Sequence, residues 1–238
     1  MTGEQTDTGP ERYRPSTLAD SLNARLKIDL YDGGFAPGEA ISIRRIAERE
    51  GISIIPARDA LRGLVGAGAL QFRDSRTIVV PPLSADTLSE LRYARIAIEG
   101  ELAELAALGP GRSALQHRLA AIDAEVTQAV LSRDTAMYMR SNRDFHFTIY
   151  RAANAPVLLE LAEHLWLRFG PGMRIVCDSL DGQLPGQDHH QNALRALADG
   201  DAPAFRSALA EDIAQGMDRI LAHASHLTHT NDPKKDAL

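Results

Sequence analysis

Four side chains in the second half of the chain are of types that bind divalent metal ions. Asn142 and His146 are four residues apart, so they lie on one face of a predicted helix. His190 and Asp212 each fall on the apolar face of a later predicted helix. A buried imidazole or carboxylate is costly unless it is paired or coordinates a cation. The four residues are therefore candidate ligands of a divalent metal ion.

Each of these residues also has an ordinary structural explanation. A histidine such as His146 on an apolar face is more often a hydrogen-bonded core residue than a ligand, and Asp212 can pair with an arginine from another helix. Spacing alone leaves these alternatives open. The same cluster could also belong to a metal-dependent helical-bundle enzyme acting on a small acid. That alternative is less favoured, because the sequence has no repeated Glu-x-x-His pattern, no nucleophile-and-base pair and no phosphate-binding glycine loop.

The elements that carry these side chains are predicted to be helices. The chain has 238 residues, of which 44% are hydrophobic but only 5% aromatic, which favours a mainly α-helical protein with two domains. Apolar periodicity, interrupted by short breaks rich in Gly, Pro and Asn, predicts helices at about 85–107, 112–131, 134–152, 155–176, 187–199 and 202–224. Six helices joined mostly by short connections predict an antiparallel six-helix bundle.

The first third of the chain has a different pattern. Leucines recur every four residues from Leu18 to Leu30, which predicts a first helix, and two more helices are expected at about 42–50 and 54–66. Two short strands at 69–72 and 77–80 flank a polar turn and form a hairpin. Three small helices followed by a hairpin predict a winged helix-turn-helix domain that binds DNA.

Charge and position select the residues expected to contact DNA. Residues 11–76 carry 11 Lys and Arg against 9 Asp and Glu, whereas the whole chain has a formal net charge of −6. A recognition helix reads the major groove with its N-terminal turns, and the preceding helix and the wing contact the DNA backbone. The candidates on these segments are Arg44, Ser53, Ile55, Ala57, Arg58, Arg73 and Arg76.

In this region the chain resembles the GntR family of bacterial transcription regulators. The residues that carry the resemblance are Phe35-Ala36-Pro37-Gly38-Glu39, Ile46-Ala47-Glu48, Gly51-Ile52-Ser53, Pro56-Ala57-Arg58-Asp59-Ala60-Leu61, and Leu64 with Gly68-Ala69-Leu70. The family usually has an arginine directly after the capping Ser or Thr, where this chain has Ile54. The resemblance implies a winged helix-turn-helix fold. With Ile54 in place of the arginine, this chain lacks one polar contact with the operator that the family usually makes.

Residues 84–224 resemble the FCD effector domain of FadR-type GntR regulators, and the six predicted helices look more like the VanR branch. The matching residues are Arg95-x-x-x-Glu99, Asn142-x-x-Phe145-His146, Ala153-Asn154, His190 with Ala196 and Asp201, and Asp212-Ile213. The resemblance implies that Asn142, His146, His190 and Asp212 hold a divalent ion, with Asp212 in place of a third histidine. Such a set suits Zn, Ni or Mn. It also implies that Arg95, and more weakly Arg174, bind a small organic acid.

We therefore expect a ligand-responsive transcription regulator, most simply a repressor, and not an enzyme. The expected organisation is a disordered tail at 1–15, a winged helix-turn-helix domain at 16–82, an FCD-like domain at 83–226 and a polar tail at 227–238. One cysteine, no secretory signal and no long apolar segment indicate a soluble cytoplasmic protein without membrane contact. Binding to palindromic operator DNA as a homodimer is also expected. Constitutive DNA binding with a purely structural metal is an alternative.

Overall fold

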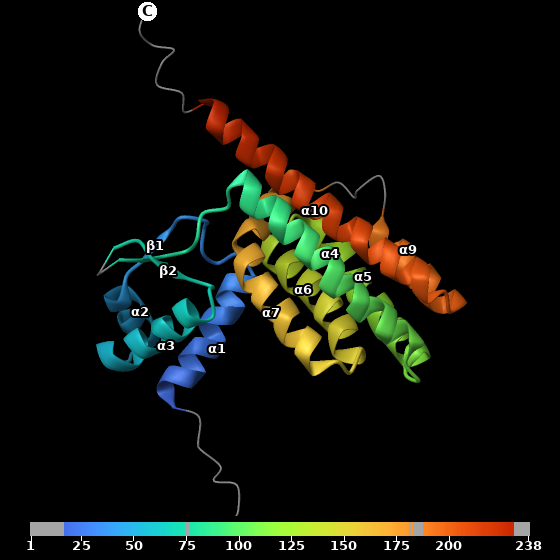
Figure 1. Ribbon diagram of the computed structural model, residues 1–238, viewed down its shortest axis with the longest axis horizontal. Coiled ribbons are helices and arrows are strands. Elements are labelled where there is room, and N and C mark those ends of the chain that lie inside the picture. The colour runs from blue at the N-terminus through green and yellow to red at the C-terminus, as the bar shows by residue number, and fades with distance from the viewer. Residues whose placement is uncertain (1–16, 75–76, 181, 183–187, 231–238) are drawn as a thin grey trace, which may run out of the picture.

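The computed structural model describes residues 17–74, 77–180, 182 and 188–230, with side chains up to residue 222. The predicted tail at 1–15 and the wing residue Arg76 lie outside these ranges. Within them the chain forms a small N-terminal unit, drawn in blue and teal in Figure 1, and a larger helical unit, drawn from green to red. The mainly α-helical fold predicted from the sequence is confirmed.

The N-terminal unit consists of three helices and a small sheet. Helix α1 (Leu18–Tyr31) begins at a capping box, in which Thr17 and Asp20 each accept a hydrogen bond from the backbone N–H of the other. Helix α3 (Ile54–Gly66) packs on both α1 and α2 (Ile43–Glu50), around a core that contains Leu22, Leu26 and Leu61. The strands are β1 (Ala40–Ile41), β2 (Gln71–Phe72) and β3 (Ile78–Val79).

These strands form an antiparallel sheet in the order β1-β3-β2. The hairpin of β2 and β3 agrees with the prediction of a wing, although both strands are shorter than predicted. Strand β1 was not predicted, because two residues are too few to show an alternating pattern. It ties the segment before α2 to the wing.

The helical unit contains α4 (Ala85–Leu108), α5 (Arg112–Ser132), α6 (Thr135–Ala152), α7 (Pro156–Phe169), α8 (Met173–Leu180), α9 (His189–Asp199) and α10 (Ala202–Thr230). The prediction of one helix at 155–176 is wrong: α7 ends at Phe169, a 3₁₀ turn follows at Gly170–Gly172, and α8 then begins. Pro171 lacks a backbone N–H donor, which interrupts the α-helical hydrogen bonds. Helix α10 runs on to Thr230, so the predicted tail at 227–238 begins inside this helix and otherwise lies outside the described residues.

The 3₁₀ turn is also where the two units meet. Helix α1 packs against α7 and against the turn, as its central position in Figure 1 shows. A Cβ atom added to Gly170 would collide with the backbone oxygen of Leu30 and lie 2.8 Å from the Cα of Tyr31. Asp32, just after α1, forms an ion pair with Arg143 of α6. We call the contact between Leu30–Tyr31 and Gly170–Gly172 the α1 joint.

No helix among the described residues is long and apolar enough to cross a membrane.

Candidate functional site

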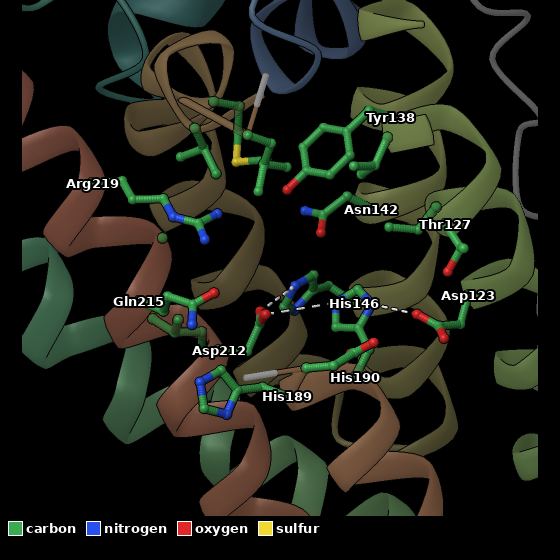
Figure 2. A pocket seen from close by; sticks show the side chains of 18 of the residues that line it. Asp123, Thr127, Tyr138, Asn142, His146, His189, His190, Asp212, Gln215 and Arg219 are labelled. Carbon is green, nitrogen blue, oxygen red and sulfur yellow. Dashed lines mark hydrogen bonds and ion pairs between the residues drawn. The ribbon is translucent and has the colours of Figure 1, made fainter. Parts of the chain in front are cut away.

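A partly open cavity of about 70 Å³ lies inside the helical unit. Residues of α4, α5, α6, α8, α9 and α10 line it, as does Phe169 at the end of α7. One water molecule needs about 10–15 Å³ of such volume, so the cavity has room for a few waters or for a small organic molecule. Figure 2 shows polar side chains of α5, α6, α9 and α10 around it.

Three of the candidate metal ligands meet at one side of this cavity. The Nε2 atom of His146 lies 3.1 Å from Oδ2 of Asp212, and Nε2 of His190 lies 3.7 Å from Oδ1 of the same carboxylate. One donor atom from each residue lies within 4.8 Å of the others. Donors that are each about 2 Å from one ion are themselves about 3–4 Å apart. The spacing therefore fits a single divalent ion bound between α6, α9 and α10.

The hydrogen bonds behind the two imidazoles explain which nitrogen faces Asp212. His190 donates its Nδ1–H to Oδ1 of Asp123 at 2.8 Å. The hydroxyl of Tyr150 donates its proton to Glu99, so its oxygen accepts the Nδ1–H of His146 at 3.0 Å. When neutral, each ring then presents an Nε2 lone pair to the cavity. This is the arrangement in which a second hydrogen bond prepares a histidine to coordinate a metal.

A bound cation would compensate for two unfavourable features of the site, an unpartnered buried nitrogen and two acceptor atoms in close contact. The Nε2 atom of His190 is buried and has no hydrogen-bond partner among the described residues. Burial lowers the pKa of His146 and outweighs the neighbouring charge of Asp212, which favours a neutral ring with a lone pair 3.1 Å from a carboxylate oxygen. A neutral Nε2 and a carboxylate oxygen are both acceptors, so a positive ion between them removes the repulsion. The donors present thus fit a divalent metal.

The remaining protonation states follow from the same charges. Burial would lower the pKa of His190, but the carboxylates of Asp212 and Asp123 outweigh it and raise this pKa. Burial would raise the pKa of Asp212, but the charge of His190 and the hydrogen bond of His146 hold that pKa well below its ordinary value. Asp212 is therefore ionised and able to act as a ligand.

Of the other three predicted site residues, Asn142 and Arg95 line the cavity and Arg174 does not. Asn142 lies one turn before His146 on α6, and its amide points into the cavity (Figure 2). Arg95 also lines the cavity. Arg174 lies on α8 with its side chain 66% exposed, pairs with Asp178 and does not line the cavity. The prediction that Arg174 contacts an effector is therefore wrong for a molecule bound in this cavity.

The charge of Arg95 is already neutralised. Its Nε and Nη2 atoms donate to the two carboxylate oxygens of Glu99 at 2.7 and 2.9 Å, and both side chains are almost completely buried. Its guanidinium also lies 3.9 Å from the ring centre of Phe169. Glu99 in turn accepts hydrogen bonds from Tyr150 and Trp166. Arg95 is thus part of a buried network that reaches His146 through Tyr150.

Several residues of the site were missed in the sequence, among them Asp123 and Arg219. Asp123, which holds His190, follows Leu119 and precedes Val126 on the apolar face of α5, and this position of an acid on an apolar stripe was an available signal. Arg219 lines the cavity seven residues after Asp212 on α10, so helical periodicity places both on one face.

The N-terminal unit presents most of the predicted DNA contacts on its surface. Ser53 is exposed at the N-cap position of α3 but makes no capping hydrogen bond, which leaves its hydroxyl available. Ile55 is 69% exposed, and Arg58 is also exposed on the same helix. Ala57 is completely buried, so the prediction that it contacts DNA is wrong. An exposed Ile54 beside Ile55 offers the leading turn of α3 an apolar surface for thymine methyl groups.

The backbone-contact candidates are exposed as well. Arg44, at the start of α2, is exposed and forms an ion pair with Glu48 one turn later. Arg73, in the wing, is exposed 4.0 Å from Asp74. Both can turn toward a phosphate, because exposed pairs of this kind are weak. Arg76 lies outside the described residues.

Comparisons with known proteins agree with this division of the chain. Residues 18–80 match the family described as "Bacterial regulatory proteins, gntR family", and residues 90–215 match the FCD domain. The HTH-type transcriptional regulator McbR of Escherichia coli K12 is 31% identical over 88% of this chain and 95% of its own length. The solved structure of E. coli McbR superposes with a TM-score of 0.78 at 29% identity, covering 87% of this chain and 98% of that one.

A third relative is the "Probable D-xylose utilization operon transcriptional repressor" of Paenarthrobacter nicotinovorans, 25% identical over 87% of this chain and 91% of its own length. These families and relatives are transcriptional regulators rather than enzymes, in agreement with the prediction from the sequence.

Proposed function

This chain belongs to the GntR family of bacterial transcriptional regulators and carries an FCD domain, and from that premise we propose that it is a metal-assisted sensor of a small organic acid that represses transcription as a homodimer. The observation that carries the proposal is the convergence of His146, His190 and Asp212 on one side of a small cavity. A relative that carries the name of a probable transcriptional repressor supports the sign of regulation.

On the DNA side, helix α3 enters the major groove by its N-terminal turn. Ser53 binds a phosphate, Ile55 contacts base edges, and Arg58 binds a guanine or a phosphate. Arg44 contacts the DNA backbone from α2, and Arg73 with Arg76 does so from the wing. One small module binds DNA weakly, so a homodimer on a palindromic operator supplies the affinity.

On the sensing side, the metal is Zn, Ni or Mn, held by His146, His190, Asp212 and the amide of Asn142. When bound, it supplies a Lewis-acidic centre that attracts an oxygen atom of the effector. Asp123 and Tyr150 orient the two imidazoles. Arg95 does not clamp the effector directly. It holds Glu99, and Glu99 holds Tyr150, so Arg95 positions His146 from behind.

The effector changes operator affinity because it favours one arrangement of the two units. Phe169 lines the cavity, and the next residue, Gly170, contacts the backbone of α1. An effector that moves Phe169 therefore moves the α1 joint. Coupling of this kind is typically worth about 1–3 kcal/mol, or about 5- to 150-fold in affinity.

The first experiment measures metal content and acid-induced stabilisation in the purified protein. We expect about one metal ion per chain, and a rise in melting temperature with at least one organic acid. His146→Ala should lose both, whereas His117→Ala, which removes an exposed histidine of α5, should keep both. Absence of metal from the wild type would refute the sensing proposal.

The second experiment tests the DNA side without knowledge of the operator. Double-stranded oligonucleotides of random sequence are selected for binding to the full chain and then sequenced. We expect an inverted repeat, and we expect Arg58→Ala to weaken binding to it. Adding an acid that stabilises the protein should weaken DNA binding. An acid that raises the melting temperature and leaves DNA binding unchanged would instead support constitutive binding with a structural metal.

A further inference from the structure

The cavity has one arginine whose charge is not neutralised by a partner. Of the two arginines that line it, Arg95 is saturated by Glu99. Arg219, which is half-buried on α10, forms no ion pair or hydrogen bond with any residue within the described part of the chain. Figure 2 shows its guanidinium directed into the cavity. A positive charge that faces a pocket without an acidic partner is suited to an anionic ligand.

The face of α10 between Arg219 and Asp212 is open. Gly216, between them, lines the cavity, and a Cβ atom added there would meet nothing within 4 Å. Asp212, Gly216 and Arg219 follow one helix face at spacings of four and three residues. Helical side chains lean toward the N-terminus, so Arg219 leans over Gly216 toward Asp212. The missing side chain leaves room for a ligand to lie along α10.

The opposite wall also offers polar groups. Tyr138 and Asn142, four residues apart on α6, point their hydroxyl and amide toward the space beside Arg219 (Figure 2). Burial raises the pKa of Tyr138, and the charge of Asp212 raises it further, so its hydroxyl keeps its proton and can donate a hydrogen bond. A carboxylate at Arg219 would thus be bound from two helices.

We propose that the cavity binds a short acid end to end along α10, with one carboxylate on Arg219 and Tyr138 and a second oxygen donor on the metal at His146, His190 and Asp212. The inference rests on the proposed sensing function and adds the effector class and its anchoring residue. A ligand with acidic or hydroxyl oxygen at both ends fits, and a monocarboxylic acid of the same length fits only one end. The cavity of about 70 Å³ restricts the ligand to a few carbon atoms.

The test uses three four-carbon acids on the full chain loaded with Zn²⁺, by isothermal titration calorimetry. Malate and succinate have oxygen donors at both ends, and butyrate has a carboxylate at one end only. We expect malate and succinate to bind at least 10-fold more tightly than butyrate. Equal affinities for the three acids, or no binding of any, would overturn the inference.

Two variants examine the residues themselves. Arg219→Gln should reduce the affinity for malate to that for butyrate, whereas Arg174→Gln removes an exposed arginine outside the cavity and should change nothing. Gly216→Leu should fill the space along α10 and abolish malate binding, with Gly216→Ala affected less. Malate binding that survives both Arg219→Gln and Gly216→Leu would overturn the inference.

Metal content and binding to the selected DNA are measured on the same samples. Each variant should retain one zinc per chain, because neither Arg219 nor Gly216 is a ligand in this assignment. If the protein binds zinc and DNA but none of the acids, the end-to-end inference is wrong, whereas the metal-binding and DNA-binding parts of the proposed function are retained. If the wild type binds neither zinc nor DNA, the proposed function itself falls.

Discussion

The buried pair of Arg95 and Glu99 makes a quantitative prediction about stability. Glu99→Gln preserves the size of the side chain but leaves the guanidinium of Arg95 buried without a counter-charge. Removing one partner of a buried ion pair costs about 3–5 kcal/mol, because the remaining charge has lost its compensation. Arg95 is 2% exposed and Glu99 is fully buried, so this range applies. Two neighbours of Glu99, Tyr150 and Trp166, also lose a charged acceptor.

The control is a pair with the same spacing in the same unit. Arg174 and Asp178 are also an arginine and an acid four residues apart, but their side chains are 66% and 60% exposed. Asp178→Asn should cost less than about 1 kcal/mol, since exposed ion pairs contribute little. The two substitutions remove the same kind of charge and differ chiefly in burial.

The assay is urea unfolding followed by the fluorescence of Trp166, the only tryptophan in the chain, which lies in the helical unit. A chelator keeps metal binding out of the comparison. With a slope of about 2 kcal/mol per molar urea, Glu99→Gln should lower the midpoint by about 1.5–2.5 M and Asp178→Asn by less than about 0.5 M. Equal shifts for the two variants would refute the reasoning that burial makes the Arg95 pair structurally essential.

Three further predictions concern other parts of the molecule. Asp123→Asn should weaken zinc binding about 10- to 100-fold in a competition with a chromogenic chelator, because it loosens His190; unchanged affinity would contradict this role. Gly170→Ala should destabilise the protein by about 1–3 kcal/mol and weaken DNA binding, since its Cβ would lie 2.8 Å from Tyr31 where ordinary contact begins near 3.4 Å. Gly111→Ala, in open space, should do neither. Burial raises the pKa of Cys177, so less thiolate is present at pH 8 and the folded protein should react with iodoacetamide more slowly than the urea-unfolded chain; equal rates would argue against this.

Local spacing predicted much of this structure because helices impose it. The period of 3.6 residues placed His146, His190 and Asp212 on inward faces, and the structure brings the three together. The same period concealed the end of α7. Trp166, Phe169, Met173 and Val176 are all buried at spacings of three and four, so the apolar stripe continues through the 3₁₀ turn as though one helix ran across it.

Helical spacing could not predict contacts between residues that are far apart in the sequence. The partner that holds His190 is Asp123, 67 residues earlier, and nothing local to either residue indicates the other. Arg95 illustrates a different limit. The resemblance implied that it binds an acid, and only the structure shows that a buried pair with Glu99 neutralises its charge. Ala57 likewise lies in the recognition helix but on its inner face.

The α1 joint has a consequence for how this chain can vary in length. Phe169 lines the cavity and Gly170 contacts α1. A single peptide bond therefore joins a residue of the cavity wall to a residue of the α1 joint. One residue inserted there would advance the chain by about 1.5–2 Å and turn it by about 100–120°. Either Phe169 would leave the cavity or Gly170 would leave α1. The turn at 109–111, in contrast, joins α4 to α5 away from both contacts, so it can gain residues at little cost to signalling.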